Sequence, residues 1–272
     1  MESARARIHP TAIVHPRAEL DPSVEVGPYT VIEAGVMIGP NCQIGPHAHF
    51  LGPTSIGADN RFHAGCVIGD APQDLKYKGQ PTRLVIGEGN VFREHFTAHR
   101  SNSEAEDTLI GSRSLFMAGS HVGHNSRVGD HVVFANGALV AGHVIVEDRA
   151  FLSGSCLVHQ FARVGTMAMM QGGSAISQDL PPYTIAHGAN LLGGLNIVGL
   201  RRAGVSAAQR LELGDLYRLL FRGSGALHEA LADARARFQG ELSLRMIEFV
   251  AAAGRRGVCR HARGRSTLGE QG

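Results

Sequence analysis

The chain has 272 residues, enough for one large domain or two modest ones, and 43% are hydrophobic, so we expect a packed core. The formal net charge of only +2 gives no support for a nucleic-acid-binding protein. The N-terminus has no signal-peptide pattern, and no run of about 18 apolar residues predicts a membrane span. Four widely spaced cysteines match no zinc-site spacing and are typical of reduced thiols, so we expect a cytoplasmic protein.

An apolar residue recurs at every sixth position between Ile8 and Ile176, in 26 hexads. Two segments, roughly 71–83 and 101–108, interrupt the repeat without changing its phase. Neither a helix nor a plain strand has a period of six, whereas a short strand followed by a sharp corner does. Three such sides make a triangular coil of eighteen residues, and such coils stack through parallel strands about 4.8 Å apart. We therefore predict an all-β parallel β-helix of hexapeptide repeats over residues 1–183.

Glycine often follows the apolar anchor of a hexad, as at Gly27, Gly45 and Gly123. Since glycine tolerates backbone angles that other residues avoid, we expect these glycines to adopt the unusual conformation of each corner.

The first interruption, "GDAPQDLKYKGQPTR" (69–83), is a long polar insertion in a regular repeat. Insertions of this kind commonly carry function, although a solvated loop without a role is the alternative. Gln73, Asp74 and Lys76 offer acceptors and a cation to a polar substrate.

Histidines cluster in the stretch "AGSHVGHNSRVG" (118–129) and in the next two coils. Residues eighteen apart lie above one another, so His124, Gly142 and Gln160 form one column, with His121, His143 and His159 beside it. They are either exposed histidines without a role, three ligands of a zinc ion with an open water position, or a general base with substrate-binding partners. In the general-base alternative, the backbone N–H of Gly142 would donate a hydrogen bond to the oxyanion that forms during the reaction.

The hexads end at "QDLPPY", and a helical pattern follows. Ser206 is the expected N-cap, and six leucines form an apolar stripe: Leu211, Leu216, Leu219, Leu220, Leu227 and Leu231. We predict a C-terminal α-helical subdomain over 184–258 and a disordered basic tail over 259–272. The late basic residues, those of "RRAGVSAAQR" (201–210) and "GRRGVCRHARGR" (254–265), form either a solvated face with a frayed tail or a docking surface for an acidic partner.

Six motifs in this order resemble the UDP-N-acetylglucosamine O-acyltransferase family over about residues 8–205: "QDLKYKGQPTR", "SHVGHN", "ALVAGHV", "VHQF", "QDLPPY" and "GLNIVGLRRAG". The resemblance implies a left-handed β-helix and an enzyme that begins lipid A biosynthesis. It implies transfer of a 3-hydroxyacyl chain from acyl carrier protein to the glucosamine 3-hydroxyl of UDP-N-acetylglucosamine, without a cofactor or metal. It also implies a cytoplasmic homotrimer with active sites between subunits.

The resemblance also implies residue roles. His124 would be the general base, and the Gly142 N–H would face the oxyanion. Substrate contacts would come from Gln73, Asp74, Lys76, His121, His143, His159 and Gln160, with Asn196 and Arg202 at the nucleotide end. Met169 and Gly172 would line the acyl-chain groove. Asn125 stands where family members usually carry aspartate. An aspartate would orient His124 and balance its positive charge, whereas an asparagine can orient the ring but cannot balance its charge.

Two alternatives stay open. One is amide-forming transfer to a 3-amino UDP-sugar. The other is a zinc-dependent hydratase like the γ-class carbonic anhydrases, which use the same fold.

Overall fold

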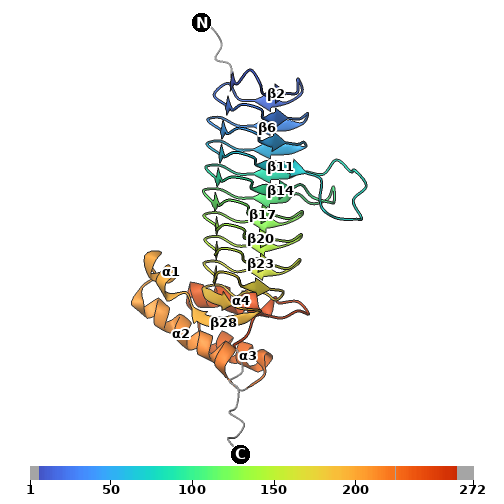
Figure 1. Cartoon of the computed structure of the whole chain (residues 1–272). Helices are drawn as coiled ribbons and strands as arrows, with labels where there is room; N and C mark the ends of the chain where they lie inside the picture. The colour runs from blue at the N-terminus through green and yellow to red at the C-terminus, as the bar shows by residue number, and fades with distance from the viewer. Residues whose placement is uncertain (1–5, 224, 262–272) are drawn as a thin grey trace, which may run out of the picture.

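Each hexad forms one short strand in the computed structural model, which describes residues 6–223 and 225–261. The strands coil into a long prism, and the helices lie at its C-terminal end (Figure 1). Every third strand belongs to the same sheet, so the prism has three parallel sheets as its faces. The predicted fold class is confirmed.

The first sheet, sheet A, contains β1 (Arg7–Ile8), β4 (Glu25–Val26), β7 (Gln43–Ile44), β10 (Arg61–Phe62), β13 (Val91–Phe92), β16 (Leu115–Phe116), β19 (Val133–Phe134), β22 (Phe151–Leu152), β25 (Met169–Met170), β27 (Thr184–His187) and β28 (Leu191–Leu195). Sheet B contains β2 (Ile13–Val14), β5 (Val31–Ile32), β8 (His49–Phe50), β11 (Val67–Asp70), β14 (Thr97–His99), β17 (His121–Val122), β20 (Leu139–Val140), β23 (Leu157–Val158) and β26 (Ala175–Ile176). Sheet C contains β3 (Glu19–Leu20), β6 (Val36–Ile38), β9 (Thr54–Ile56), β12 (Leu84–Ile86), β15 (Thr108–Ile110), β18 (Arg127–Val128), β21 (Ile145–Val146) and β24 (Arg163–Val164).

The apolar anchors fill the interior of the prism. Every anchor from Val26 to Ile176 is buried, whereas Ile8 in the first strand is 43% exposed because that strand has a neighbour on one side only. Phenylalanines of successive coils stack inside, with ring centroids 4.7 Å apart for Phe62 and Phe92 and 5.0 Å for Phe92 and Phe116. The repeat thus builds one continuous hydrophobic core.

The glycines after the anchors serve a different purpose from the one expected. The left-handed backbone lies three residues after the anchor, at positions such as Tyr29, Asn41 and His47. A Cβ atom on Gly123 would instead lie 2.6 Å from the carbonyl carbon of Ala141 in the next coil. The prediction of the corner conformation was therefore wrong for Gly27, Gly45 and Gly123, because these glycines allow neighbouring coils to stack closely. Gly69, which follows the anchor Ile68, does have a positive φ of 81°.

Both interruptions of the repeat leave the prism at the same corner. The segment between β11 and β12 and the segment between β14 and β15 form loops that project from the prism beside sheet B (Figure 1). The strands on either side keep their pairing, since Ser55 pairs with Val85 and Val85 with Leu109. The coils therefore continue past the loops without a change of phase.

The C-terminal part begins with β27 and β28, which pair antiparallel, and continues with α1 (Ile197–Arg202), α2 (Ala207–Arg222), α3 (Leu227–Arg237) and α4 (Glu241–Ala251). Ser206 caps α2 as predicted, with its Oγ accepting from the Gln209 N–H at 3.2 Å. The stripe assignment was wrong for Leu211, which is 65% exposed because α2 buries its Leu213, Leu216 and Leu220 face. Leu219, Leu227 and Leu231 are partly buried against the same core.

The chain returns to the end of the prism after α4. Val258 bridges to Asp179, and Arg260 bridges to Leu191. Cys259 is buried there, and all four cysteines are free. Most of the basic tail expected at 259–272 lies outside the described residues, which end at His261.

Candidate functional site

A cleft of about 650 Å³ lies on sheet B, next to the loop after β11. Strands β17, β20 and β23 provide its floor, where the apolar side chains of Leu139 and Leu157 are exposed. It is lined by Gln73, His99, His121, Gly123, His124, Leu139, Val140, Ala141, Gly142, Leu157, Val158, His159, Gln160, Ala175, Ile176, Ser177, Ala189 and Asn190. The structure therefore brings together the predicted residues Gln73, His121, His124, Gly142, His159 and Gln160.

His124 projects from the corner after β17 and lies against Gly142 in the next coil. A Cβ atom on Gly142 would be 2.5 Å from both Cε1 and Nε2 of the His124 ring, so only glycine leaves room for this imidazole. The opposite edge of the ring faces Asn125, with 2.9 Å between His124 Nδ1 and Asn125 Oδ1. The Nε2 edge is thus directed toward the next coil.

Gly142 stands two residues after its anchor, Val140. In N-terminal coils the equivalent positions are proline, as at Pro28, Pro40 and Pro46, which shows that the repeat does not need an N–H there. Within the described residues, no backbone carbonyl accepts from the Gly142 N–H. A backbone donor without a backbone partner therefore stands beside His124 Nε2.

His143 completes the cluster from the corner after β20. Its ring lies 5.1 Å from that of His124, nearly perpendicular to it, and stacks on Phe161 at 4.7 Å. Burial lowers the pKa of His143, and a positive charge on His124 would lower it further. His143 is therefore neutral at pH 7.

His121 is held on β17 by Thr97, whose Oγ1 lies 2.7 Å from His121 Nδ1. The ring of His99, a residue that sequence analysis did not select, packs edge-on against it at 4.8 Å. Burial lowers the pKa of His121 to about 4, with His99 adding to the effect. Both properties favour a neutral imidazole as a hydrogen-bonding group for substrate.

The low pKa of His121 predicts a pH dependence of stability. Because the ordinary histidine pKa is 6.5, the unfolded chain binds this proton more readily than the folded one. The stability from neutral His121 is therefore present above pH 6.5 and is lost as the pH falls toward about 4. Thermal unfolding at a series of pH values should show a smaller loss of Tm for His121→Gln than for the wild type. Equal losses would contradict this assignment.

The loop after β11 carries the predicted polar group Asp74. Its Oδ1 accepts from the Lys76 N–H at 2.9 Å, and its Oδ2 accepts from Asn102 Nδ2 at 2.6 Å. These two hydrogen bonds lower the pKa of the carboxyl group, so Asp74 is ionised at pH 7. Gln73 and Lys76 are exposed on either side of it.

His159 and Gln160 are exposed at the far end of the cleft and are contacted by a residue from the C-terminal segment. Arg256 Nη1 lies 2.8 Å from His159 Nδ1 and also donates to the Gln160 carbonyl. Its guanidinium carbon is 5.8 Å from the centre of the Phe161 ring. The C-terminal return of the chain therefore places a cation at this cleft.

Seven predicted residues are not part of the cleft lining: Asp74 and Lys76 follow Gln73 on the loop and His143 packs on His124, whereas the other four lie elsewhere. Asn196 caps α1, accepting from the Gly199 N–H and donating to the Met167 carbonyl, and Arg202 is exposed at the end of the same helix. Met169 lies on β25 in sheet A, and Gly172 is exposed at the next corner. Within one chain, these four residues are separate from the histidine cluster.

His99, Asn102, Asn190 and Arg256 lie in or next to the site but were not predicted from the sequence. The pairing of Thr97 with His121 shows that the second loop breaks the eighteen-residue spacing, which hides His99 and Asn102 from a column argument. Arg256 comes from a segment outside the repeat, so no spacing signal pointed to it.

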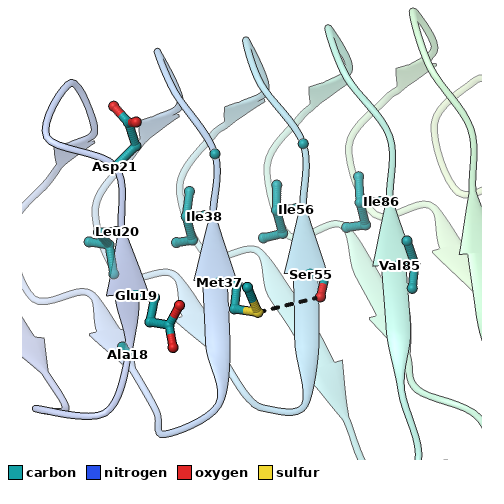
Figure 2. A pocket seen from close by; sticks show the side chains of 12 residues that line it. Ala18, Glu19, Leu20, Asp21, Met37, Ile38, Ser55, Ile56, Val85 and Ile86 are labelled. Atoms are coloured by element: carbon teal, nitrogen blue, oxygen red, sulfur yellow. Dashed lines mark hydrogen bonds between the residues drawn. The ribbon is translucent and has the colours of Figure 1, made fainter.

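A second hollow of about 840 Å³ lies over the N-terminal half of sheet C (Figure 2). Figure 2 shows its floor formed by Met37, Ser55 and Val85, with Glu19 and Asp21 at one end. It has no histidine, lysine, arginine or cysteine in its lining. Its titratable groups are the carboxyl groups of Glu19 and Asp21, so it lacks the histidine cluster of the cleft on sheet B.

Among residues 6–223 and 225–261, no three histidine, cysteine or carboxylate side chains are grouped so as to hold a metal ion. Over the same residues, none of the helices combines the length and the apolar character that crossing a membrane requires.

Known families match both parts of the chain. A model described as "Udp N-acetylglucosamine O-acyltransferase; Domain 2" matches residues 179–259. A model of six bacterial transferase hexapeptide repeats matches residues 35–70 and 107–142.

Individual relatives agree with these models. The acyl-[acyl-carrier-protein]–UDP-N-acetylglucosamine O-acyltransferase of Agrobacterium fabrum is 39% identical over 97% of this chain and 98% of its own. The enzyme of the same name from Gloeothece citriformis is 44% identical over 66% of each chain. The solved UDP-N-acetylglucosamine acyltransferase of Francisella novicida superposes with a TM-score of 0.89 at 29% identity, covering 97% of this chain and all of that one. The Arabidopsis enzyme gives 0.84 at 34% identity, covering 93% of this chain and all of its own. These names favour neither an amide-forming transferase nor a zinc hydratase.

Proposed function

Because the chain belongs to the UDP-N-acetylglucosamine O-acyltransferase family, we propose that it transfers a 3-hydroxyacyl chain from acyl carrier protein to the sugar 3-hydroxyl of UDP-N-acetylglucosamine. It is an acyltransferase, and His124 acts as its general base. The observation that carries this assignment is the Nε2 edge of His124 facing the Gly142 backbone, beside the loop that holds Asp74. The product would be the first intermediate of lipid A biosynthesis.

The reaction needs one proton acceptor and one oxyanion donor. His124 Nε2 takes the proton of the sugar hydroxyl while the oxygen attacks the thioester carbonyl. The tetrahedral oxyanion accepts a hydrogen bond from the Gly142 N–H. When the carbon–sulfur bond breaks, the thiolate of the carrier leaves and takes the proton back from the imidazolium, so the base is regenerated.

The other residues of the cleft bind and orient the substrates. Ionised Asp74 accepts hydrogen bonds from sugar hydroxyls, with Gln73 and Lys76 beside it. The side chains of His121, His143, His159 and Gln160 contact the sugar, the pyrophosphate or the acyl group. Leu139 and Leu157 give the acyl chain an apolar surface.

The remaining candidates require a second subunit. In a homotrimer with sites between subunits, Asn196 and Arg202 would reach the nucleotide, where a guanidinium suits a phosphate. Met169 and Gly172 would line the acyl-chain groove. Leu75, beside Asp74, is 99% exposed, which fits packing of this loop against a neighbouring subunit. The late basic residues would steer the acidic carrier protein toward the site.

A transfer assay tests this function. Purified protein is incubated with UDP-N-acetylglucosamine and 3-hydroxyacyl carrier proteins of several chain lengths, and products are identified by mass spectrometry. We expect an O-acylated UDP-sugar whose yield a chelator does not change. The preferred chain length is read from the same reactions.

The assay also separates the alternatives. Product only with a 3-amino UDP-sugar would replace the ester-forming reaction with an amide-forming one. Loss of activity with chelator, restored by zinc, would contradict catalysis by His124 as a free base.

A further inference from the structure

The side chain that contacts His124 is a neutral amide, and its orientation is fixed. Asn125 Oδ1 lies 2.9 Å from His124 Nδ1 and accepts from the Asn102 backbone N–H at 3.0 Å. Because a backbone N–H only donates, the atom between these two groups is the amide oxygen. An oxygen there requires a donor on the ring, so Nδ1 carries the proton and Nε2 keeps its lone pair.

The hydrogen bonds of Asn125 prevent its side-chain amide from flipping by 180°. The residue is 5% exposed, its φ is 57°, and its own N–H donates to Thr108 Oγ1 at 2.7 Å. Its Nδ2 donates to Ser101 Oγ at 2.7 Å. That hydroxyl donates to the Ser103 carbonyl at 2.9 Å, which leaves a lone pair toward Asn125. The loop after β14 is therefore matched to an amide rather than a carboxylate.

Asn102 connects this pair to the sugar-binding loop. Its backbone N–H bonds Asn125 Oδ1, and its side-chain Nδ2 donates to Asp74 Oδ2 at 2.6 Å. Asn102 thus links Asp74, the carboxylate proposed to hold the sugar, to Asn125, the partner of the proposed base His124.

We propose that Asn125 and Asn102 are positioning residues that keep the proton of the neutral His124 ring on Nδ1 and tie that ring to Asp74. This inference rests on the proposed function, since it assigns the partners of the base. Asn125 orients the imidazole without adding a negative charge, so the base works with a neutral partner.

The other groups that face His124 define what a new charge would do. Asp74 is the carboxylate whose negative charge interacts with His124. Burial lowers the pKa values of His99, His121 and His143, so these three rings are neutral at pH 7. The negative charge of Glu106, on the loop after β14, opposes the lowering of the His143 pKa. Lys76 lies beside Asp74. A carboxylate at position 125 would contact the ring directly and favour its protonated form.

The test is the pH profile of kcat/KM for wild type and Asn125→Asp, with UDP-N-acetylglucosamine and a 3-hydroxyacyl carrier protein. We expect the acidic limb of the variant to move to higher pH by about 1 pH unit or more. A purely structural role would lower the rate at every pH without moving that limb, and an unmoved limb overturns the proposal. Asn41→Asp makes the same change at an equivalent left-handed corner outside the cleft and should leave the limb in place.

Asn102→Ala separates the two links, because it removes the amide that bonds Asp74 but keeps the backbone N–H. We expect KM for the UDP-sugar to rise about tenfold or more, as for loss of a hydrogen bond to a charged group, with the acidic limb unmoved. An unchanged KM would overturn the link to Asp74.

Two further measurements keep the inference separate from the proposed function. If His124→Ala retains full activity, the base itself is wrong and the proposed function fails. If that variant is inactive and the Asn125→Asp limb does not move, only the positioning role fails. Nitrogen NMR of ¹⁵N-histidine-labelled wild-type protein should show His124 protonated at Nδ1, assigned by the signal absent from His124→Ala. Protonation at Nε2 would overturn the inference without any Asn125 variant.

Discussion

Replacing His124 by alanine is expected to lower kcat/KM for acyl transfer by about 10²–10⁴-fold, the usual contribution of a general base. The ring is not part of the prism core, since it projects from a corner into the cleft. The variant should therefore keep its thermal midpoint and its oligomeric state. Steady-state kinetics and thermal unfolding on the same preparation check both statements.

His131→Ala is the matched control for this variant. His131 is an exposed corner histidine outside the cleft, and its Nε2 is bonded to Arg113 at 3.2 Å. We expect its activity to stay close to that of the wild type. Full activity in His124→Ala would remove His124 from the mechanism, whatever the control shows.

Gly142→Ala is expected to have the second-largest effect, a loss of about 100-fold in kcat. The new methyl group would overlap Cε1 and Nε2 of His124, and a displacement of about 1 Å at a reacting group costs rates of this order. The His124 ring would have to leave its place beside the Gly142 N–H. Kinetics of the purified variant measure the loss, and its structure should show the imidazole moved.

A double variant tests whether Gly142 acts through His124. If it does, His124→Ala/Gly142→Ala should be no slower than His124→Ala alone, because the displaced ring is already absent. A further large loss in the double variant would mean that the Gly142 backbone contributes independently, as an oxyanion donor disturbed by the new side chain would. Activity of Gly142→Ala equal to that of the wild type would contradict the close approach of the ring.

Much of the site was predictable because it lies within the repeat. His124, Gly142 and Gln160 are separated by eighteen residues, and parallel pairing converts that spacing into a column. His121, His143 and His159 follow from the same register. Asp74 was predictable only as a polar group on an inserted loop, because no periodicity fixes where such a loop folds.

The left-handed corners were assigned to the wrong residue for a related reason. Glycine after the anchor is a clear sequence signal, but it has two possible physical causes, an unusual φ or a lack of space. Only the distance from Gly123 to the next coil shows that space is the cause. The left-handed positions themselves accept histidine, asparagine, arginine and tyrosine, so their composition gives no comparable signal.

The sequence by itself determined the prism, because one buried anchor in every six residues forces a short strand and a corner each time. It also determined the histidine column, since contacts between coils repeat with the same fixed spacing. Only the tertiary structure decided the partners of the base. Asn102 reaches Asn125 and Asp74 across an irregular loop, and Arg256 reaches His159 from the far end of the chain. Such contacts depend on how loops and termini pack in three dimensions, and no local period encodes that.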